Sequence, residues 1–160
     1  MNFIQYMSVI QRNYYRYLDA RLEKFQIGAG QQFFLTCIYE HDGITMFDLA
    51  KGGKFDKGTV TKGIQKLLEQ DYISVAVDEN DKRVRHLHIT EKGIPLAREI
   101  YRIRREWREQ LTTGLSEEES RRLTEQLREM AECSCRTLQT IAENKGECEN
   151  GRKHTKECQS

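Results

Sequence analysis

Residues 49–62 read Leu-Ala-Lys-Gly-Gly-Lys-Phe-Asp-Lys-Gly-Thr-Val-Thr-Lys, and this stretch decides the fold. One short helix, which Thr45 caps, ends in this stretch, and a second short helix begins in it. A tight Gly-Gly connection joins the two. Asp56 is a good N-cap for the second helix, whose inner face consists of Val60, Ile64, Leu67 and Leu68. Two short helices joined in this way predict a helix-turn-helix.

The apolar period changes from 3.6 to 2 directly after the second helix. Apolar residues alternate with others from Ile73 to Val77 and again from Leu87 to Ile89, with the turn formers Asp78-Glu79-Asn80-Asp81 between them. This pattern predicts a β-hairpin with a charged tip. With a preceding helix at residues 31–41, the segment 31–90 is predicted to be a winged helix-turn-helix.

Long helices are expected on both sides of this segment. Apolar residues follow steps of three and four from Phe3 to Phe25, and a Ser116–Glu119 capping box opens a second long helix at residues 116–144. A connecting helix spans residues 91–113, and Pro95 must delay or distort its first turns. The two outer helices present more apolar surface than the small core can cover, which predicts a homodimer through 3–25 and 116–144.

Composition agrees with one mainly α domain, residues 1–144, that carries a small β-hairpin wing. Of 160 residues, 38% are hydrophobic and 32% charged, whereas about 45–50% and 25% are typical. The excess charge suits elongated helices or an oligomer. Residues 145–160 hold no large apolar side chain, so we expect a disordered tail. The sequence contains no membrane span and no signal peptide, which predicts a cytoplasmic protein.

Positive charge gathers where a winged helix would meet DNA. The net charge is +1, yet residues 51–66 hold five lysines and one aspartate. Polar and basic side chains off the apolar stripe can contact bases and phosphates in the major groove, and cations at the hairpin tip suit a narrow minor groove. The candidate contacts to double-stranded DNA are Thr45, Lys54, Lys57, Thr59, Thr61, Lys62, Gln65, Lys66, Lys82, Arg83 and Arg85.

Residues 49–62 resemble the MarR-type pattern of a Leu-Ala start, a turn and Thr-Val-Thr-basic, with no gap in length. Residues 81–93, Asp-Lys-Arg-Val-Arg-His-Leu-His-Ile-Thr-Glu-Lys-Gly, are similar to the family wing, in which Asp-x-Arg runs to Leu-x-Leu-Thr-x-x-Gly. With the flanking helices the resemblance covers residues 3–144. It implies a homodimeric transcriptional regulator in which Arg83 enters the minor groove and Asp81 supports the wing. Two copies would read a pseudo-palindromic operator.

The chain departs from the family pattern at three positions. Gly53 stands where Leu is usual, which predicts a looser turn, and Gly58 stands where Ser is usual, which removes one phosphate-contacting hydroxyl. Pro95 is also unusual in the following helix.

Regulation is expected to come from a small aromatic effector. A ligand near Phe34, Cys37 and Trp107 would change the spacing of the two recognition helices, which predicts a repressor relieved by ligand. One alternative is a redox-responsive regulator that switches through Cys37. The redox-sensing branch of the family, however, usually carries its cysteine in the first helix, and this first helix has none.

A second alternative is a helical adaptor that uses the winged helix for protein contacts. That function predicts an acidic or apolar exposed face on the second helix of the helix-turn-helix, whereas this sequence has a basic one.

No catalytic constellation is visible, so we expect neither an enzyme nor a cofactor. There is no Gly-rich phosphate loop and no nucleophile motif. Zinc-type donors are present at Cys133, Cys135, Cys148, His154 and Cys158, but their spacing matches no standard pair, and we predict no metal site there. His86 and His88 lie on one side of a strand, and we interpret them as exposed strand histidines.

Overall fold

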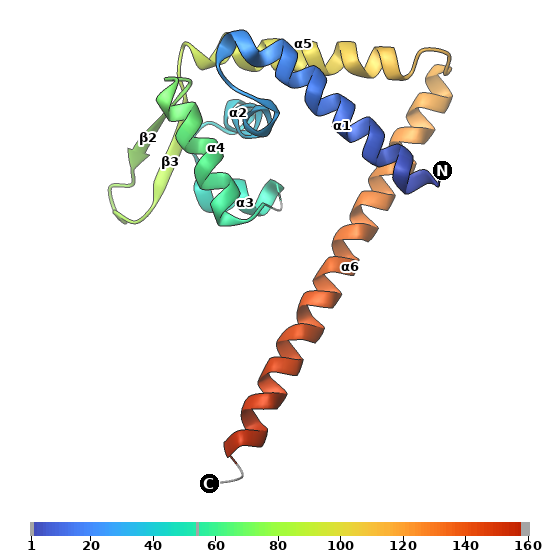
Figure 1. The fold of residues 1–160 in the computed structure, drawn as a ribbon. Coiled ribbons are helices and arrows are strands. Elements are labelled where there is room, and N and C mark those ends of the chain that lie inside the picture. Colours follow the sequence, from blue (N-terminus) through green and yellow to red (C-terminus); the bar gives the residue numbers. More distant parts are fainter. Residues whose placement is uncertain (1, 54, 158–160) are drawn as a thin grey trace. The chain divides into compact units, whose positions relative to one another are not determined.

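A computed structural model describes residues 2–53 and 55–157, with side chains described as far as Ile141. Its elements are α1 (Phe3–Leu22), η1 (Glu23–Phe25), α2 (Ala29–Glu40), β1 (Ile44–Thr45), α3 (Met46–Gly53), α4 (Lys57–Glu69), β2 (Ile73–Val77), β3 (Arg85–Ile89), α5 (Gly93–Leu111) and α6 (Glu117–Glu157) (Figure 1). The chain divides into two compact units, residues 1–111 and 112–160. The predicted fold class, mainly helical with a small β wing, is confirmed.

The sheet contains three strands rather than the two that the sequence predicted. β2 and β3 form the predicted antiparallel hairpin, which Figure 1 shows beside α4. β1 pairs with the other edge of β3, with Ile44 opposite Leu87 and Thr45 opposite His86. Sequence patterning missed β1 because a strand of two residues is too short to show an alternating period.

The core of the first unit joins α2, α4 and α5. Its fully buried side chains include Leu18, Leu22, Phe34, Leu35, Ile38, Leu49, Val60, Leu67, Leu87, Leu96, Ile100 and Ile103. α4 packs directly on α2 at Gly63, where an added Cβ would overlap the ring of Phe34. The absence of a side chain at Gly63 therefore sets how closely the two helices approach.

Gly53 and Phe55, on either side of residue 54 between α3 and α4, are tightly packed, in contrast to the predicted loose turn. The Phe55 N–H donates to the Ala50 carbonyl at 3.0 Å, and the Phe55 ring lies 5.1 Å from that of Phe33 and 5.2 Å from that of Phe34. A Cβ on Gly53 would be 2.5 Å from the Phe55 ring. Phe55 thus occupies the space next to Gly53, and the prediction failed because it considered one position without its neighbour.

The starts of α2 and α5 are each fixed by a hydrogen bond to a side chain that precedes the helix. α2 begins at Ala29 rather than Gln31, because Asp19 of α1 accepts a hydrogen bond from the Ala29 N–H at 2.7 Å. α5 begins at Gly93, whose N–H donates to the Thr90 hydroxyl at 3.1 Å. Pro95 therefore lies in the first turn, where a missing N–H costs no intrahelical hydrogen bond.

α6 begins with the predicted capping box. The Ser116 N–H donates to Glu119 Oε2 at 2.8 Å, and the Glu119 N–H donates to Ser116 Oγ at 3.3 Å. The helix continues to Glu157, so residues 145–157 are helical where a disordered tail was predicted. No proline follows Ser116, so each further residue can add a helical hydrogen bond. Residues 158–160 lie outside the described chain. None of the described helices is long and apolar enough to span a membrane.

Candidate nucleic-acid interface

α4 presents its polar and basic side chains on the face away from the core. Val60, Gly63, Ile64 and Leu67 are buried against the rest of the unit. The predicted contact residues of this helix are all exposed: Lys57, Thr59, Thr61, Lys62, Gln65 and Lys66. Lys54, another predicted contact, lies outside the described residues. The described part of this face is therefore basic, as the sequence indicated.

Several of the predicted hydroxyl and amide contacts already have partners within the chain. Asp56 caps α4, because its Oδ1 accepts the Thr59 N–H at 2.9 Å and its Oδ2 accepts the Thr59 hydroxyl at 2.6 Å. These bonds lower the pKa of Asp56. The Thr61 hydroxyl donates to the Lys57 carbonyl at 2.8 Å, and Gln65 Nε2 donates to Glu69 at 3.2 Å. Thr61 keeps free lone pairs, whereas the Thr59 hydroxyl proton is committed to the cap.

Thr45 caps α3, as the sequence suggested. Its Oγ1 accepts the Asp48 N–H at 3.1 Å and donates to Asp48 Oδ2 at 2.7 Å. Its oxygen thus orients the first turn of α3 next to the wing.

The wing turn is organised by Asp78, one of the predicted turn formers, although only Asp81 was predicted to support the wing. Asp78 Oδ1 accepts the N–H groups of Asn80 at 2.8 Å and Asp81 at 2.9 Å, and the Asp78 N–H donates to the Val84 carbonyl at 3.1 Å. Asp81 Oδ1 accepts the Arg83 N–H at 2.9 Å. An aspartate that bonds the backbone two residues on is a known turn former, so Asp78-Glu79-Asn80 carried the signal.

Both strand histidines have partners and are not simply solvated. His86 lies between the Gly43 carbonyl, 2.8 Å from Nδ1, and Asp78 Oδ2, 3.1 Å from Nε2, and these hydrogen bonds raise the pKa of His86. His88 Nδ1 is 2.9 Å from Asp42 Oδ2, and this bond lowers the pKa of Asp42. Within the described side chains, no group of three or more His, Cys, Asp or Glu is placed to hold a metal. Cys148, His154 and Cys158 lie outside them.

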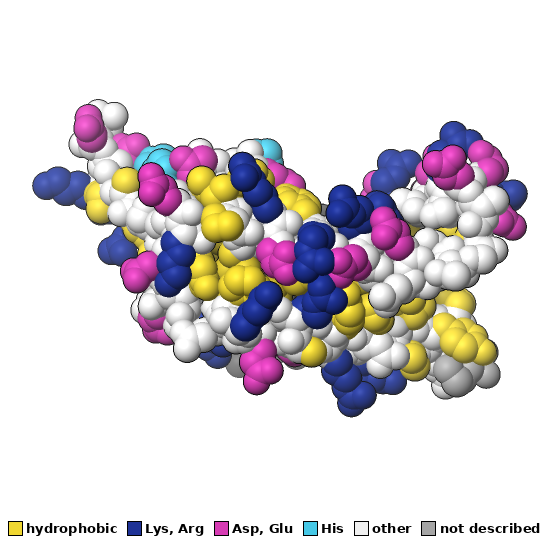
Figure 2. Space-filling model, turned by 90° about the horizontal axis from the view of Figure 1, so that it is seen from above, with side chains coloured by type: hydrophobic (Ala, Val, Ile, Leu, Met, Phe, Trp, Pro, Cys, Tyr) yellow, Lys and Arg dark blue, Asp and Glu magenta, His cyan; other side chains and the backbone are white. Residues whose placement is uncertain are grey.

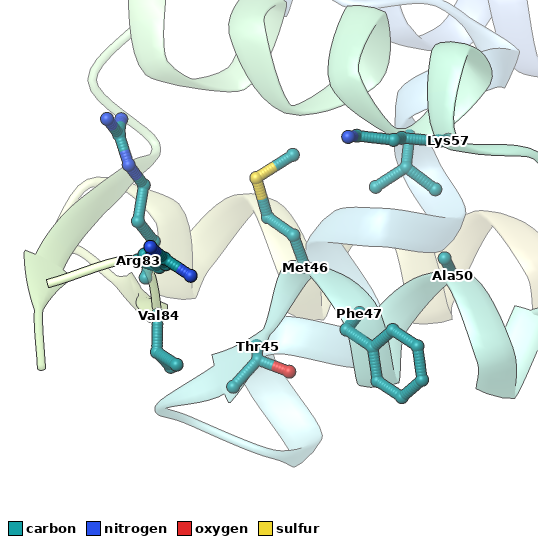
Figure 3. A pocket seen from close by; sticks show the side chains of 9 residues that line it. Thr45, Met46, Phe47, Ala50, Lys57, Arg83 and Val84 are labelled. Carbon is teal, nitrogen blue, oxygen red and sulfur yellow. The ribbon is translucent and has the colours of Figure 1, made fainter. Parts of the chain in front are cut away.

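A cavity of about 670 Å³ separates the wing from α3 and α4. It is bordered by cations from both sides and by apolar side chains of α3, and its lining is Thr45, Met46, Phe47, Ala50, Lys57, Val60, Arg83, Val84 and Arg85. In Figure 3, Arg83 and Val84 lie across this space from Lys57, and Met46 points into it. The fold thus brings together predicted contacts of α4 and the wing. Phe47, which sequence reasoning missed, is 75% exposed.

The three predicted effector residues do not line one cavity. Phe34 is buried in the core, and Trp107 packs against the rings of Tyr14 and Tyr17, with centroids 5.8 and 5.0 Å away. Cys37 lines a separate cavity of about 380 Å³. Burial, and then the charge of Glu40, raise the pKa of Cys37, which disfavours the reactive thiolate.

Arg104 contributes a cation to the Cys37 cavity, whose lining is Phe33, Thr36, Cys37, Glu40, His41, Ile44, Asp48, Gly52 and Arg104. Its Nε donates to Gln32 Oε1 at 2.7 Å, and its Nη2 donates to Thr36 Oγ1 at 3.0 Å. Its guanidinium carbon also lies 5.6 Å from the centre of the Tyr101 ring. These partners are neutral, whereas the carboxylates of Glu40 and Asp48 line the same cavity.

Comparison with known proteins matches this chain to MarR-type transcriptional regulators in both sequence and fold. The MarR family model matches residues 29–84, from α2 to the wing. A MarR transcriptional regulator from Methanosarcina mazei Go1 is 33% identical, with a TM-score of 0.76 over 82% of this chain and 95% of that one. Staphylococcus aureus MepR in a DNA complex is 28% identical, with a TM-score of 0.77 over 83% and 98%. The HTH-type transcriptional regulator BilQ of Clostridium symbiosum (strain WAL-14163) is 26% identical, covering 76% and 84%.

Proposed function

The chain belongs to the MarR family of transcriptional regulators, and on that premise we propose that it is a homodimeric repressor released from its operator by a small ligand. Proteins of this family are regulators and not enzymes. The proposed operator is a pseudo-palindromic site in double-stranded DNA, and the proposed place of action is the cytoplasm.

The observation that carries the DNA-binding proposal is the cation-bordered space between α4 and the wing. Lys57 approaches it from α4, while Arg83 and Arg85 approach it from the wing. With α4 in the major groove and the wing in the minor groove, a phosphate strand would pass between them. Each cation that neutralises a phosphate there would release a condensed counterion. The fold match to MepR, which was solved with DNA, supports this arrangement.

Exposed apolar side chains on the outer helices support the dimer. On α1 they are Phe3, Ile4, Met7 and Ile10, and on α6 they are Leu123, Leu127, Met130, Leu138 and Ile141. Apolar side chains gathered on a helix face in this way mark a protein interface. Two subunits related by a two-fold axis would place two copies of α4 about 34 Å apart, one turn of DNA.

The DNA proposal is tested by separating affinity from sequence reading. DNA retained by the protein at physiological salt is sequenced to define the operator, and variants are then compared on operator and random DNA. Lys66→Ala is expected to weaken binding to both and to lower the salt slope by about one. Thr61→Val is expected to reduce the difference in binding free energy between operator and random DNA by about 1–3 kcal/mol.

Lys24→Ala serves as the matched control, because Lys24 is an exposed lysine of η1, outside α4 and the wing. Binding that is equally indifferent to Lys24→Ala, Lys66→Ala and Thr61→Val would overturn the placement of α4 in the groove. A protein that retains no DNA but captures a protein partner would favour the adaptor alternative.

For the effector we propose a small aromatic acid in the Cys37 cavity. Phe33 offers an aromatic surface and Arg104 a cation, and the volume of about 380 Å³ is within the range of ligand sites, about 300–1,000 Å³. The acid must bind more tightly to the dimer conformation whose subunit spacing excludes DNA than to the conformation that binds DNA. This site replaces the predicted grouping of Cys37 with Phe34 and Trp107.

The effector proposal is tested by DNA release with phenolic acids and, separately, with peroxide. Wild type and Cys37→Ser should both release DNA with the acid, and Arg104→Gln should require more of it, because the carboxylate loses its cation. Peroxide-dependent release that disappears in Cys37→Ser would favour the redox alternative over the ligand.

A further inference from the structure

His86 lies between two groups that can only accept hydrogen bonds. Its Nδ1 is 2.8 Å from the carbonyl oxygen of Gly43, and its Nε2 is 3.1 Å from a carboxylate oxygen of Asp78. A neutral imidazole carries one ring hydrogen and would turn a lone pair toward one of these oxygens, whereas a protonated ring donates to both. The geometry therefore fits the imidazolium form.

The two acceptors belong to different parts of the winged helix. Gly43 forms the corner before β1, and its N–H donates to the Leu87 carbonyl at 2.8 Å. Asp78 follows β2, and its other carboxylate oxygen accepts the N–H groups of Asn80 and Asp81. Since Asp81 in turn accepts the Arg83 N–H, a chain of hydrogen bonds runs from the corner before β1 to the wing arginine.

We propose that His86 is a positioning residue that holds the wing, and with it Arg83, in the DNA-binding position only while its ring is protonated. Affinity for the operator is then higher in acid than in alkaline solution. This inference rests on the proposed DNA-binding function, and it adds a pH response that needs no effector.

Among the charged and titratable groups around His86, Asp78 is the one that is hydrogen-bonded to its ring. Asp78 faces it from the end of β2. Asp42, at the corner before β1, is bonded to His88 Nδ1 and to the Ile89 N–H. Figure 2 shows histidine side chains at the surface beside acidic ones.

The remaining neighbours reach His86 less directly. Thr45 of β1 lies opposite His86, and its hydroxyl is hydrogen-bonded to Asp48. On β3 itself His88 shares its face, while Arg85 is on the opposite face because side chains alternate along a strand.

The direction of the pH effect follows from the protonation state. The bonds to the Gly43 carbonyl and then to Asp78 raise the pKa of His86 above its ordinary value of about 6.5. The contribution of these bonds is therefore complete below about pH 6.5 and is lost as the pH rises through the raised value. Asp78 stays ionised over this range, because the Asp81 N–H and then His86 lower its pKa.

The first experiment measures operator affinity between pH 6 and 8.5 at constant ionic strength in wild type, His86→Gln and His88→Gln. Loss of one net hydrogen bond predicts that wild-type affinity falls about two- to tenfold. His86→Gln should be independent of pH, at the affinity that wild type has in alkaline solution. His88→Gln is the matched control, because His88 lies on the same face of β3 but has a single described carboxylate partner, and it should keep the wild-type fall.

The second experiment uses the free protein and NMR. Both ring nitrogens of His86 should remain protonated above pH 6.5, and the Arg83 amide resonance should shift with the same midpoint in wild type but not in His86→Gln. A His86 midpoint at or below 6.5, an Arg83 amide that ignores it, or an equal fall of affinity in wild type and His86→Gln would overturn the proposal. No DNA binding at any pH would overturn the proposed function, while the NMR titration would still decide the positioning of the wing.

Discussion

One added methyl group at Gly63 tests how α4 is seated on the core. The Cβ of Gly63→Ala would overlap two carbons of the Phe34 ring, far inside the 3.0 Å that Cβ atoms essentially never cross. Phe34 is 1% exposed and is enclosed by the rings of Phe33 and Phe55. The ring therefore has no room to turn aside, and α4 must move away from α2.

The expected magnitude combines two opposing effects. Forcing a methyl group into a packed interior costs about 1–3 kcal/mol. Replacing glycine by alanine within a helix regains about 1 kcal/mol. Gly63→Ala should therefore lower the free energy of unfolding by up to about 2 kcal/mol. Gly30→Ala is the control in α2, because nothing lies within 4 Å of its added Cβ, and it should gain about 0.4–1 kcal/mol.

Urea unfolding followed by circular dichroism, at one protein concentration for all variants, measures both changes. In a Phe34→Leu background the Gly63→Ala substitution should cost less than in wild type, because the smaller side chain leaves space for the methyl group. Equal stability of Gly63→Ala and Gly30→Ala would refute the reasoning, and so would a cost of Gly63→Ala that Phe34→Leu leaves unchanged.

Two further predictions concern the start of α4 and the wing. Because the hydroxyl and N–H of Thr59 lower the pKa of Asp56, the stabilising effect of its charge is present above the ordinary carboxyl pKa of about 3.9 and is lost as the pH falls through the lowered value. The stability advantage of wild type over Asp56→Asn should therefore shrink between pH 5 and 3 in urea unfolding, and a constant difference would contradict this. In gel-shift titrations Arg83→Ala should lose most of the affinity, and Arg83→Lys should recover only part of it, because lysine lacks the planar fork of arginine. Full recovery by lysine would mean that only the charge matters.

Periodicity in the sequence was sufficient to predict the elements that carry the proposed function. The amphipathic pattern after Asp56 predicted α4 and its exposed lysines, and the alternating pattern predicted the β2–β3 hairpin. The Ser116 capping box predicted the start of α6. These features are local, because each depends on residues within a few positions of one another.

Contacts between distant segments could not be predicted in this way. β1 is stabilised by pairing with β3, and the start of α2 is capped by Asp19 from another helix. The same holds for the proposed effector site, where Arg104 of α5 meets Cys37 of α2, while Phe34 packs elsewhere in the core. His86 was interpreted as solvated because its partner Gly43 is distant in the sequence.

The packing of Phe55 beside Gly53 has a consequence for how this turn evolves. Because an added Cβ at Gly53 would meet the rings of Phe55 and Phe33, the two turn positions share one volume. In relatives with the usual leucine at the position of Gly53, we expect a small residue at the position of Phe55. Substitutions at the two positions should therefore occur together during evolution. A protein with only one of them would have either two large side chains in this volume or a cavity.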